Sequence, residues 1–309
     1  MAIGLTAICY FPIVLLACAP NPPMPDPHSG QFIGSYEEVI ELPGPVAAGF
    51  SDSEFDQLLR PDDIPPVYSP MFVPASEANL PDDELVIGLA IGDDTRTYPA
   101  GILFAREMVN DVVGGVPVLV SWCPRCYAAL VHDRRADGSV SVFGNQGALY
   151  KGAMTWFDHE TGSVWSQPLG AALAGPRAGA TLSLIPSQLT TWSDWSASHP
   201  QTRVLVVDEP SQPFRGRRPG PDHVVGVVIG DTAVALPYDQ ILPTMPHEIK
   251  VGDISVTVWR DAHSGAIQAK QLHESGNQRR EIPVLIAYRS AWLKFHPDSL
   301  IGPTREPGR

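Results

Sequence analysis

The chain has 309 residues, 44% of them hydrophobic, and a formal net charge of −13. This hydrophobic fraction is sufficient for a folded core, while 32 prolines and 27 glycines predict many turns and loops. Nucleic acids and anionic membrane surfaces bind clustered basic residues, so the acidic composition argues against both. We therefore expect no nucleic-acid partner.

The N-terminus has the features of an export signal. Residues 2–17 carry no charge, and Leu15-Leu16-Ala17 leads directly into Cys18. An apolar run this short that ends in a small residue is typical of a secretory signal rather than a membrane span. We predict a lipoprotein signal peptide over residues 1–17, lipidation of Cys18 and a proline-rich linker over residues 18–35. The anchor would attach the protein to a membrane of the cell envelope, on the periplasmic or outer surface. An ordinary signal peptide is the alternative, because no Lys or Arg precedes the apolar run.

Two stretches of the chain resemble one another. Residues 86–128 align without a gap with residues 224–266, and the block that begins at Ile185 aligns with the block that begins at Ile282. Self-similarity of this kind indicates a duplicated unit. We predict a first copy over residues 36–209 and a second, shorter copy over 210–309 that lacks an insertion present in the first.

The first elements of the repeated unit follow from hydrophobic spacing. The apolar run 85–91 predicts a strand that turns at Gly92 and returns over residues 96–98. Pro99 then opens a stretch in which apolar residues recur at helical spacing, namely Ile102, Met108, Val109 and Val112. This spacing predicts a helix that ends at Gly114-Gly115.

A second hairpin and a second helix follow in the same copy. Residues 116–122 and 127–132 predict two strands joined by the tight turn Cys123-Pro124-Arg125-Cys126. Residues 186–200 predict a short helix capped by Thr190 or Thr191. The predicted fold class is α+β and strand-dominated, with two tandem copies of a hairpin-rich β unit and short helices.

The cysteine pair is the most distinctive chemical feature. Cys123 and Cys126 are the two cysteines outside the leader, and the repeat aligns them with Asp261 and Ser264. The scaffold therefore does not require thiols at this turn. A disulfide across two residues closes a short loop and removes little entropy from the unfolded chain. This favours redox or metal chemistry, with a structural disulfide as the alternative.

A metal site would need further ligands. Cys-Pro-x-Cys at a hairpin turn is similar to one knuckle of a zinc or iron ribbon, but the second knuckle is absent. His199 matches His296 of the second copy, which favours a structural role, and His132 lies six residues along an extended strand from Cys126. His159 is the remaining candidate. The cofactor is otherwise unknown; Cys123, Cys126 and His159 would hold a thiolate-bound copper, zinc or iron ion.

Several motifs together resemble a known family. They are DDELVIGLAIGDDTRTYP, VNDVVGGVPVLVSWCPRC, VFGNQGALY, DHETGSVWSQPLG and TTWSDWSASHP. In this order they resemble the exported proteins of domain of unknown function 3179 (DUF3179), from about Asp62 to Val204 and more weakly to Pro297. The resemblance implies secreted or anchored envelope proteins of bacteria and archaea, with the Cys-Pro-x-Cys turn as a signature.

Two positions depart from the family pattern. The family has Trp-His-Glu where this chain has Ala105-Arg106-Glu107, and Gly where this chain has Tyr127. If the family histidine helps to bind a metal, Arg106 replaces a ligand with a fixed positive charge that disfavours a cation. The same charge would stabilise a thiolate, so we place Arg106 with Cys123 and Cys126 as candidate catalytic residues.

The insertion of the first copy carries candidate substrate-binding residues. Asn145, Tyr150, Lys151 and Ser166 stand in family-like motifs that the second copy lacks. We expect them to form a pocket near the thiols. The predicted function is an exported, lipid-anchored envelope protein with a redox-active or metal-handling Cys pair beside this pocket. The alternative is a non-catalytic cell-surface binding module in which the pair is a structural disulfide.

Overall fold

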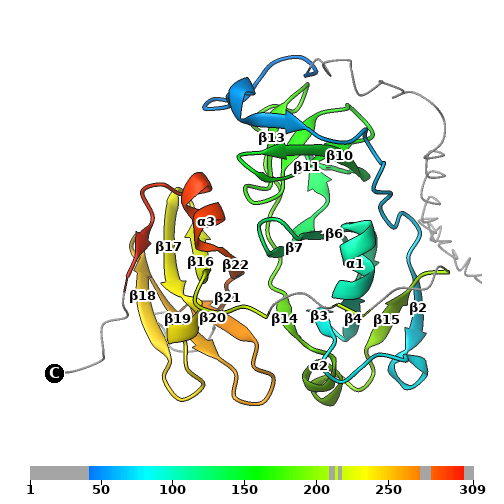
Figure 1. Cartoon of the computed structure of the whole chain (residues 1–309), viewed down its shortest axis with the longest axis vertical. Helices are drawn as coiled ribbons and strands as arrows, with labels where there is room; N and C mark the ends of the chain where they lie inside the picture. The colour runs from blue at the N-terminus through cyan, green and yellow to red at the C-terminus, as the bar shows by residue number, and fades with distance from the viewer. Residues whose placement is uncertain (1–41, 209–212, 215–217, 272–279, 303–309) are drawn as a thin grey trace, which may run out of the picture. The chain divides into compact units, whose positions relative to one another are not determined.

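The computed structural model describes residues 42–208, 213–214, 218–271 and 280–302 (Figure 1). The predicted signal peptide, Cys18 and the 18–35 linker lie outside these residues, as does the boundary predicted at 209–210. The described residues belong to one compact unit of the chain. None of the helices within them is long and apolar enough to cross a membrane. We refer to residues 42–208 as the N-terminal part and residues 218–302 as the C-terminal part.

The fold is strand-dominated, as predicted, and each sheet takes its strands from one part alone. In the N-terminal part, one five-stranded sheet has the order β1–β10–β11–β12–β13. Its strands are β1 (Phe55–Gln57), β10 (Phe143–Tyr150), β11 (Ala153–Asp158), β12 (Val164–Ser166) and β13 (Ala171–Ala174).

A second five-stranded sheet has the order β14–β3–β4–β15–β2. Its strands are β2 (Met71–Pro74), β3 (Leu85–Ile91), β4 (Asp94–Pro99), β14 (Gln188–Thr191) and β15 (Arg203–Val206). The remaining strands of this part form a three-stranded sheet of β5 (Met108–Val113), β6 (Val116–Cys123) and β7 (Ala128–Asp133), and a pair of β8 (Arg135–Ala136) and β9 (Ser139–Val140). The helical elements are η1 (Asp52–Glu54), η2 (Ala75–Glu77), α1 (Ala100–Arg106) and α2 (Trp192–Ser198).

The C-terminal part has two four-stranded sheets. The first has the order β22–β16–β17–β23, with β16 (His223–Ile229), β17 (Thr232–Pro237), β22 (Leu285–Tyr288) and β23 (Leu300–Ile301). The second has the order β18–β19–β20–β21, with β18 (His247–Val251), β19 (Ile254–Arg260), β20 (Ile267–Gln271) and β21 (Arg280–Glu281). The helical elements are η3 (Tyr238–Gln240) and α3 (Arg289–Phe295).

The strand pairings of the two parts correspond. Successive pairings along β14–β3–β4–β15 are antiparallel, antiparallel and parallel, and those along β22–β16–β17–β23 have the same directions. Helix α2 directly follows β14, and α3 directly follows β22. Trp195 is the fourth residue of α2, as Trp292 is of α3, and both are buried.

The helix predicted from Pro99 to Gly114 is only partly correct. Helix α1 ends at Arg106, because Glu107 takes a left-handed conformation (φ 57°) and its N–H bonds to Leu103 O. Residues Met108–Val113 instead form strand β5, which pairs with β6. The apolar positions at helical spacing therefore belong to two elements: Ile102 lies in α1, whereas Met108, Val109 and Val112 lie in β5. Met108 and Val109 are buried strand residues.

Two glycines allow the tryptophans to pack closely on their sheets. A Cβ atom added to Gly88 would lie 2.3 Å from the ring of Trp195, and one added to Gly226 would lie 2.0 Å from the ring of Trp292. The ring of each tryptophan therefore occupies the place of a side chain on β3 or β16. This contact therefore requires glycine at position 88 opposite Trp195 and at position 226 opposite Trp292.

Gly88→Ala and Gly226→Ala should each lower the free energy of unfolding by about 1–3 kcal/mol, because the added methyl group overlaps a buried indole. Chemical denaturation measures the change. Gly220→Ala is the control, since an added Cβ there meets no atom within 4 Å. Equal stabilities of all three variants would contradict the close-packing explanation.

Candidate functional site

The Cys-Pro-Arg-Cys turn joins β6 to β7, on the side of the N-terminal part that contacts the C-terminal part. Cys123 ends β6, Cys126 precedes β7, and the two form a disulfide. The N–H of Cys126 donates to Cys123 Sγ over 3.3 Å. Each cysteine is only 1% exposed. The sulfur atoms are therefore sealed inside the protein rather than presented to solvent.

Gln167 supports the turn from the loop that follows β12. Its side chain is fully buried, and its Nε2 donates to Ser121 Oγ over 3.1 Å and to Ala128 O over 3.0 Å. Its Oε1 lies 3.6 Å from Cys126 Sγ. Since these partners flank the disulfide on β6 and β7, Gln167 holds the two ends of the hairpin in register.

The turn contacts the C-terminal part. The N–H of Tyr288 donates to Cys126 O over 3.1 Å. A small, mainly apolar cavity beside the turn is lined by Cys126, Ala128 and Pro168 together with residues of β22 and α3, among them Leu285, Trp292 and Phe295. The space next to the disulfide is therefore completed by the C-terminal part, rather than by the four residues we had predicted to form a pocket there.

Tyr127 occupies the position where the family resemblance places glycine. Its φ of 57° is in the left-handed region that favours glycine. The ring is 3% exposed and packs edge-on against Trp122, His223 and Tyr288, with centroid distances of 5.0, 4.5 and 5.7 Å. The departure from the family pattern thus adds an aromatic contact with the C-terminal part.

The predicted substrate-binding residues lie in separate surroundings. Asn145 is buried in β10, at a register shift between β10 and β11. Tyr150 ends β10, where its ring stacks on Phe50 at 5.2 Å. Lys151 follows in the turn and pairs with Glu54 over 3.6 Å. Ser166 ends β12 and is fully buried, and its hydroxyl has no hydrogen-bond partner among the described residues.

Asn145 is the centre of a half-buried polar network. Its Nδ2 donates to Glu107 Oε2 over 2.7 Å, and its backbone N–H donates to Asp62 Oδ1 over 2.8 Å. Asp62 Oδ2 accepts from Tyr68 O–H over 2.6 Å, and the Tyr68 oxygen lies 3.0 Å from His159 Nε2. Because the phenol hydrogen is committed to Asp62, Nε2 of His159 must be the donor toward Tyr68.

Burial shifts the titration of this network. It raises the pKa of Asp62, although the Tyr68 hydroxyl, the Asn145 N–H and His159 oppose the shift. Burial also raises the pKa of Glu107, with the Asn145 amide opposing. It lowers the pKa of His159 against the attraction of Asp62, Glu160 and Asp158. Asp62 and Glu107 both have positive φ values, so two carboxylates on strained backbone converge on Asn145.

The predicted metal ligands are not brought together. His159 is held by Tyr68 and stacks on Phe157 with ring centroids 5.1 Å apart. Within the described ranges, no group of three or more His, Cys, Asp or Glu side chains could hold a metal ion. Arg106 is the half-buried last residue of α1, and α1 is connected to the turn through Glu107 O, which accepts from Trp122 N–H over 2.8 Å. The prediction of a copper, zinc or iron site therefore gains no support from the geometry.

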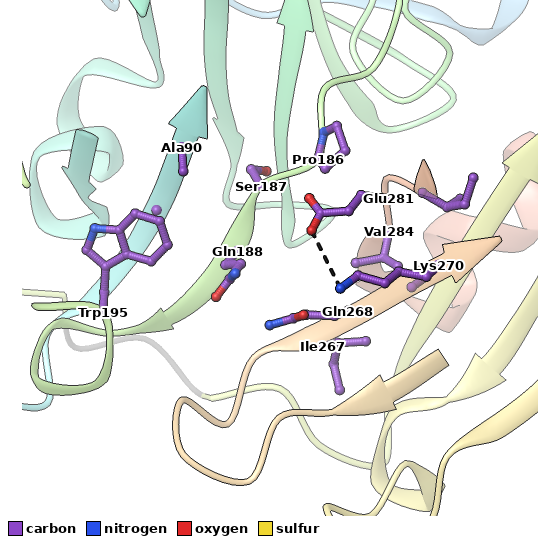
Figure 2. A pocket seen from close by; sticks show the side chains of 13 residues that line it. Ala90, Pro186, Ser187, Gln188, Trp195, Ile267, Gln268, Lys270, Glu281 and Val284 are labelled. Carbon is purple, nitrogen blue, oxygen red and sulfur yellow. Dashed lines mark ion pairs between the residues drawn. The ribbon is translucent and has the colours of Figure 1, made fainter. Parts of the chain in front are cut away.

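A larger groove opens away from the disulfide (Figure 2). It is lined by residues of both parts. Figure 2 shows Ala90, Ser187, Gln188 and Trp195 on one side and Ile267, Gln268, Lys270, Glu281 and Val284 on the other. Lys270 and Glu281 form an ion pair of 3.9 Å, so the charges at this rim offset each other. Gln188 and Gln268 line the groove with amide side chains, each of which carries a hydrogen-bond donor and an acceptor.

The sequence profile described as protein of unknown function (DUF3179) matches residues 61–219. This match covers the turn, the polar network and β14.

The chain belongs to the DUF3179 family.

No curated protein and no solved structure matches this DUF3179 protein significantly. The family assignment confirms the resemblance carried by the motifs, and it leaves the function to be argued from the site.

Several site residues escaped prediction from the sequence. Asp62 and Tyr68 lie in a loop without a motif, and Glu107 stands out in the sequence only as the neighbour of Arg106. Gln167 and the groove residues of β14 and β20 likewise carry no spacing signal. Two of these residues did carry a motif signal: Glu107 keeps the family residue within Ala105-Arg106-Glu107, and Gln167 stands in the motif DHETGSVWSQPLG.

A second buried histidine, His132, predicts that the stability of the fold depends on pH. His132 in β7 is fully buried against Trp156, and neither ring nitrogen has a hydrogen-bond partner among the described residues. Burial lowers the pKa of His132 to about 3. The folded protein therefore keeps this ring neutral at pH values where the unfolded chain protonates it.

His132→Phe should flatten the acid branch of the stability profile. As pH falls from about 6.5 toward 3, the unfolded wild type gains a proton that the folded state refuses, so unfolding becomes easier by up to about 1.4 kcal/mol per pH unit. The variant lacks this contribution. Asp62 and Glu107 have raised pKa values in the folded state, so in both proteins they increase the free energy of unfolding as the pH falls. Denaturation at several pH values measures the slopes, with the exposed His263→Phe as control. Parallel wild-type and variant slopes would refute the assignment.

Tyr127→Gly tests the balance between strain and packing. Glycine would relieve about 1–2 kcal/mol of left-handed strain, but loss of the buried ring should cost about 3–5 kcal/mol. The free energy of unfolding should therefore fall by about 2 kcal/mol. A variant as stable as the wild type would show that the aromatic contact contributes little.

Proposed function

We propose that this DUF3179 protein is a non-catalytic binding module of the cell surface, in which the Cys123–Cys126 disulfide is structural and the groove between β14 and β20 receives the ligand. The burial of the disulfide carries the proposal. A thiol-exchange enzyme must expose a sulfur atom to its substrate, and each of these cysteines is only 1% exposed. A redox-active pair is the less favoured alternative for the same reason.

The lining of the groove indicates the class of ligand. Gln188 and Gln268 each present a donor and an acceptor, Ser187 adds a hydroxyl, and the ion pair of Lys270 with Glu281 leaves little net charge. The net charge of −13 also repels anions. We therefore propose an uncharged ligand rich in hydroxyl or amide groups.

Export and lipid anchoring at Cys18 belong to the same proposal. The apolar residues 1–17 and the sequence Leu-Leu-Ala-Cys support export, and a disulfide is typical of oxidising compartments. The lipid would hold the groove at the surface of a membrane, where extracellular or periplasmic ligands are within reach.

We also infer that the two parts arose by duplication. The matched sequence blocks, the corresponding strand pairings and the repeated Gly–Trp contact support this origin. Under this interpretation the β10–β13 sheet belongs to the insertion of the first copy, and the groove is a product of the pairing of two copies.

Ala90→Trp should abolish ligand binding by filling the groove. Ala90 is an exposed groove residue of β3, so a large side chain there need not disturb the core. Val228 occupies the matched position on β16 and is 38% exposed, which makes Val228→Trp the control. The purified proteins would be applied to arrays of cell-surface saccharides and peptides. Binding that survives Ala90→Trp, or is lost equally in both variants, would overturn the groove as the ligand site.

A further inference from the structure

The two matched turns close in different ways. In the N-terminal part the turn is closed by the Cys123–Cys126 disulfide. In the C-terminal part the matched residues are Asp261 and Ser264, and Asp261 Oδ1 accepts from the N–H of Ser264 over 2.8 Å and from its hydroxyl over 3.0 Å. The same turn is thus held covalently in one part and by hydrogen bonds in the other.

Each turn also binds the opposite part through the same carbonyl position. Cys126 O accepts from the N–H of Tyr288, the last residue of β22. The matched Ser264 O accepts from the hydroxyl of Thr190 near the end of β14. The two parts therefore bind each other reciprocally, with one turn of each part joined to the edge strand of the other.

Apolar contacts surround the cysteine-bearing turn. Cys123 and Cys126 share a buried cluster with Leu285, Ala287 and Trp292 of the C-terminal part. Both cysteines are almost completely buried, so a reductant does not reach the sulfur atoms while these contacts are in place. Local separation of β22 and α3 from the turn would remove the cover that the C-terminal part provides and expose the disulfide.

We propose that the Cys123–Cys126 turn is a redox-sensitive lock between the two parts of the chain. A dithiol reductant supplies the electrons. One of its thiolates attacks a sulfur of the disulfide, and the other cysteine leaves as a thiolate that takes up a proton. The second reductant thiol then displaces the first cysteine, which leaves two cysteine thiols and the oxidised reductant.

Reduction of the disulfide and local separation of the C-terminal part from the turn each favour the other. Contact with β22 and α3 protects the disulfide, and loss of the disulfide frees the turn that presents Cys126 O to Tyr288. The Asp261–Ser264 turn is unaffected by reduction, so one of the two reciprocal contacts remains. Reduction should therefore loosen the C-terminal part locally without unfolding the chain. This inference does not depend on the ligand of the groove.

A pair of matched tryptophan variants tests the lock. Trp292 lines the cavity beside Cys126, whereas Trp195 packs on β3, away from that cavity, in the matched position of the first copy. In the full chain without denaturant, Trp292→Ala should accelerate reduction of the disulfide by dithiothreitol about tenfold, which corresponds to a local opening easier by about 1.4 kcal/mol. Trp195→Ala, which removes an equally buried indole, should leave the rate within about twofold of the wild-type rate. Equal acceleration in both variants would mean that only global unfolding exposes the disulfide, and it would overturn the proposal.

Hydrogen exchange supplies a readout that needs no tryptophan variant. The amide hydrogen of Tyr288, which bonds to Cys126 O, should exchange at least about tenfold faster in the reduced wild type than in the oxidised wild type. The amide hydrogens of β14 serve as the control and should change little. Unchanged protection at Tyr288 after complete reduction would also overturn the proposal.

Discussion

The packing of the β6–β7 turn against β22 and α3 is the constraint on which the arrangement of this protein depends. It buries the disulfide, joins Cys126 O to the N–H of Tyr288 and places the two largest hydrophobic clusters across both parts of the chain. Since no sheet formed by the described residues takes strands from both parts, side-chain packing and these turn contacts hold the parts together. The groove exists because both parts contribute to its walls.

The burial of the turn changes the interpretation of the cysteine pair. A short disulfide stabilises little through loop entropy, and from the sequence alone this argument favours a redox or metal role over a structural disulfide. In the folded chain, however, the pair closes a turn whose counterpart uses Asp261 and Ser264 for the same purpose. The disulfide lies where the turn contacts β22 and α3, and the loop-entropy argument takes no account of this contact. Tyr127 enlarges this contact by accepting a left-handed conformation.

In the polar network around Asn145, partial burial acts on titratable side chains that are hydrogen-bonded to one another. Asp62 and Tyr68 come from the loop between β1 and β2, Glu107 from the end of α1 and His159 from the end of β11, and hydrogen bonds link the four side chains and Asn145. Half-burial raises the pKa of the Asp62 and Glu107 carboxyl groups and lowers the pKa of His159, while the hydrogen bonds and charges within the network oppose these shifts. It fixes the loop over residues 60–68 against β10.

The sequence by itself determined the local elements and the family. Apolar runs and turn residues predicted the β3–β4 and β6–β7 hairpins, because these signals act between neighbours in the chain. Of the two predicted caps, Thr191 begins α2, but residues 188–191 form strand β14 and not the first part of the helix predicted over 186–200. The helix predicted through Met108 failed, since the left-handed Glu107 ends α1 for reasons that spacing does not encode. Only the tertiary structure decided which side chains meet. In the structure, Asn145, Tyr150, Lys151 and Ser166 lie in separate surroundings. His159 contacts Tyr68, and the C-terminal part packs against the disulfide. These outcomes depend on contacts between residues far apart in the sequence, and periodicity carries no information about such contacts.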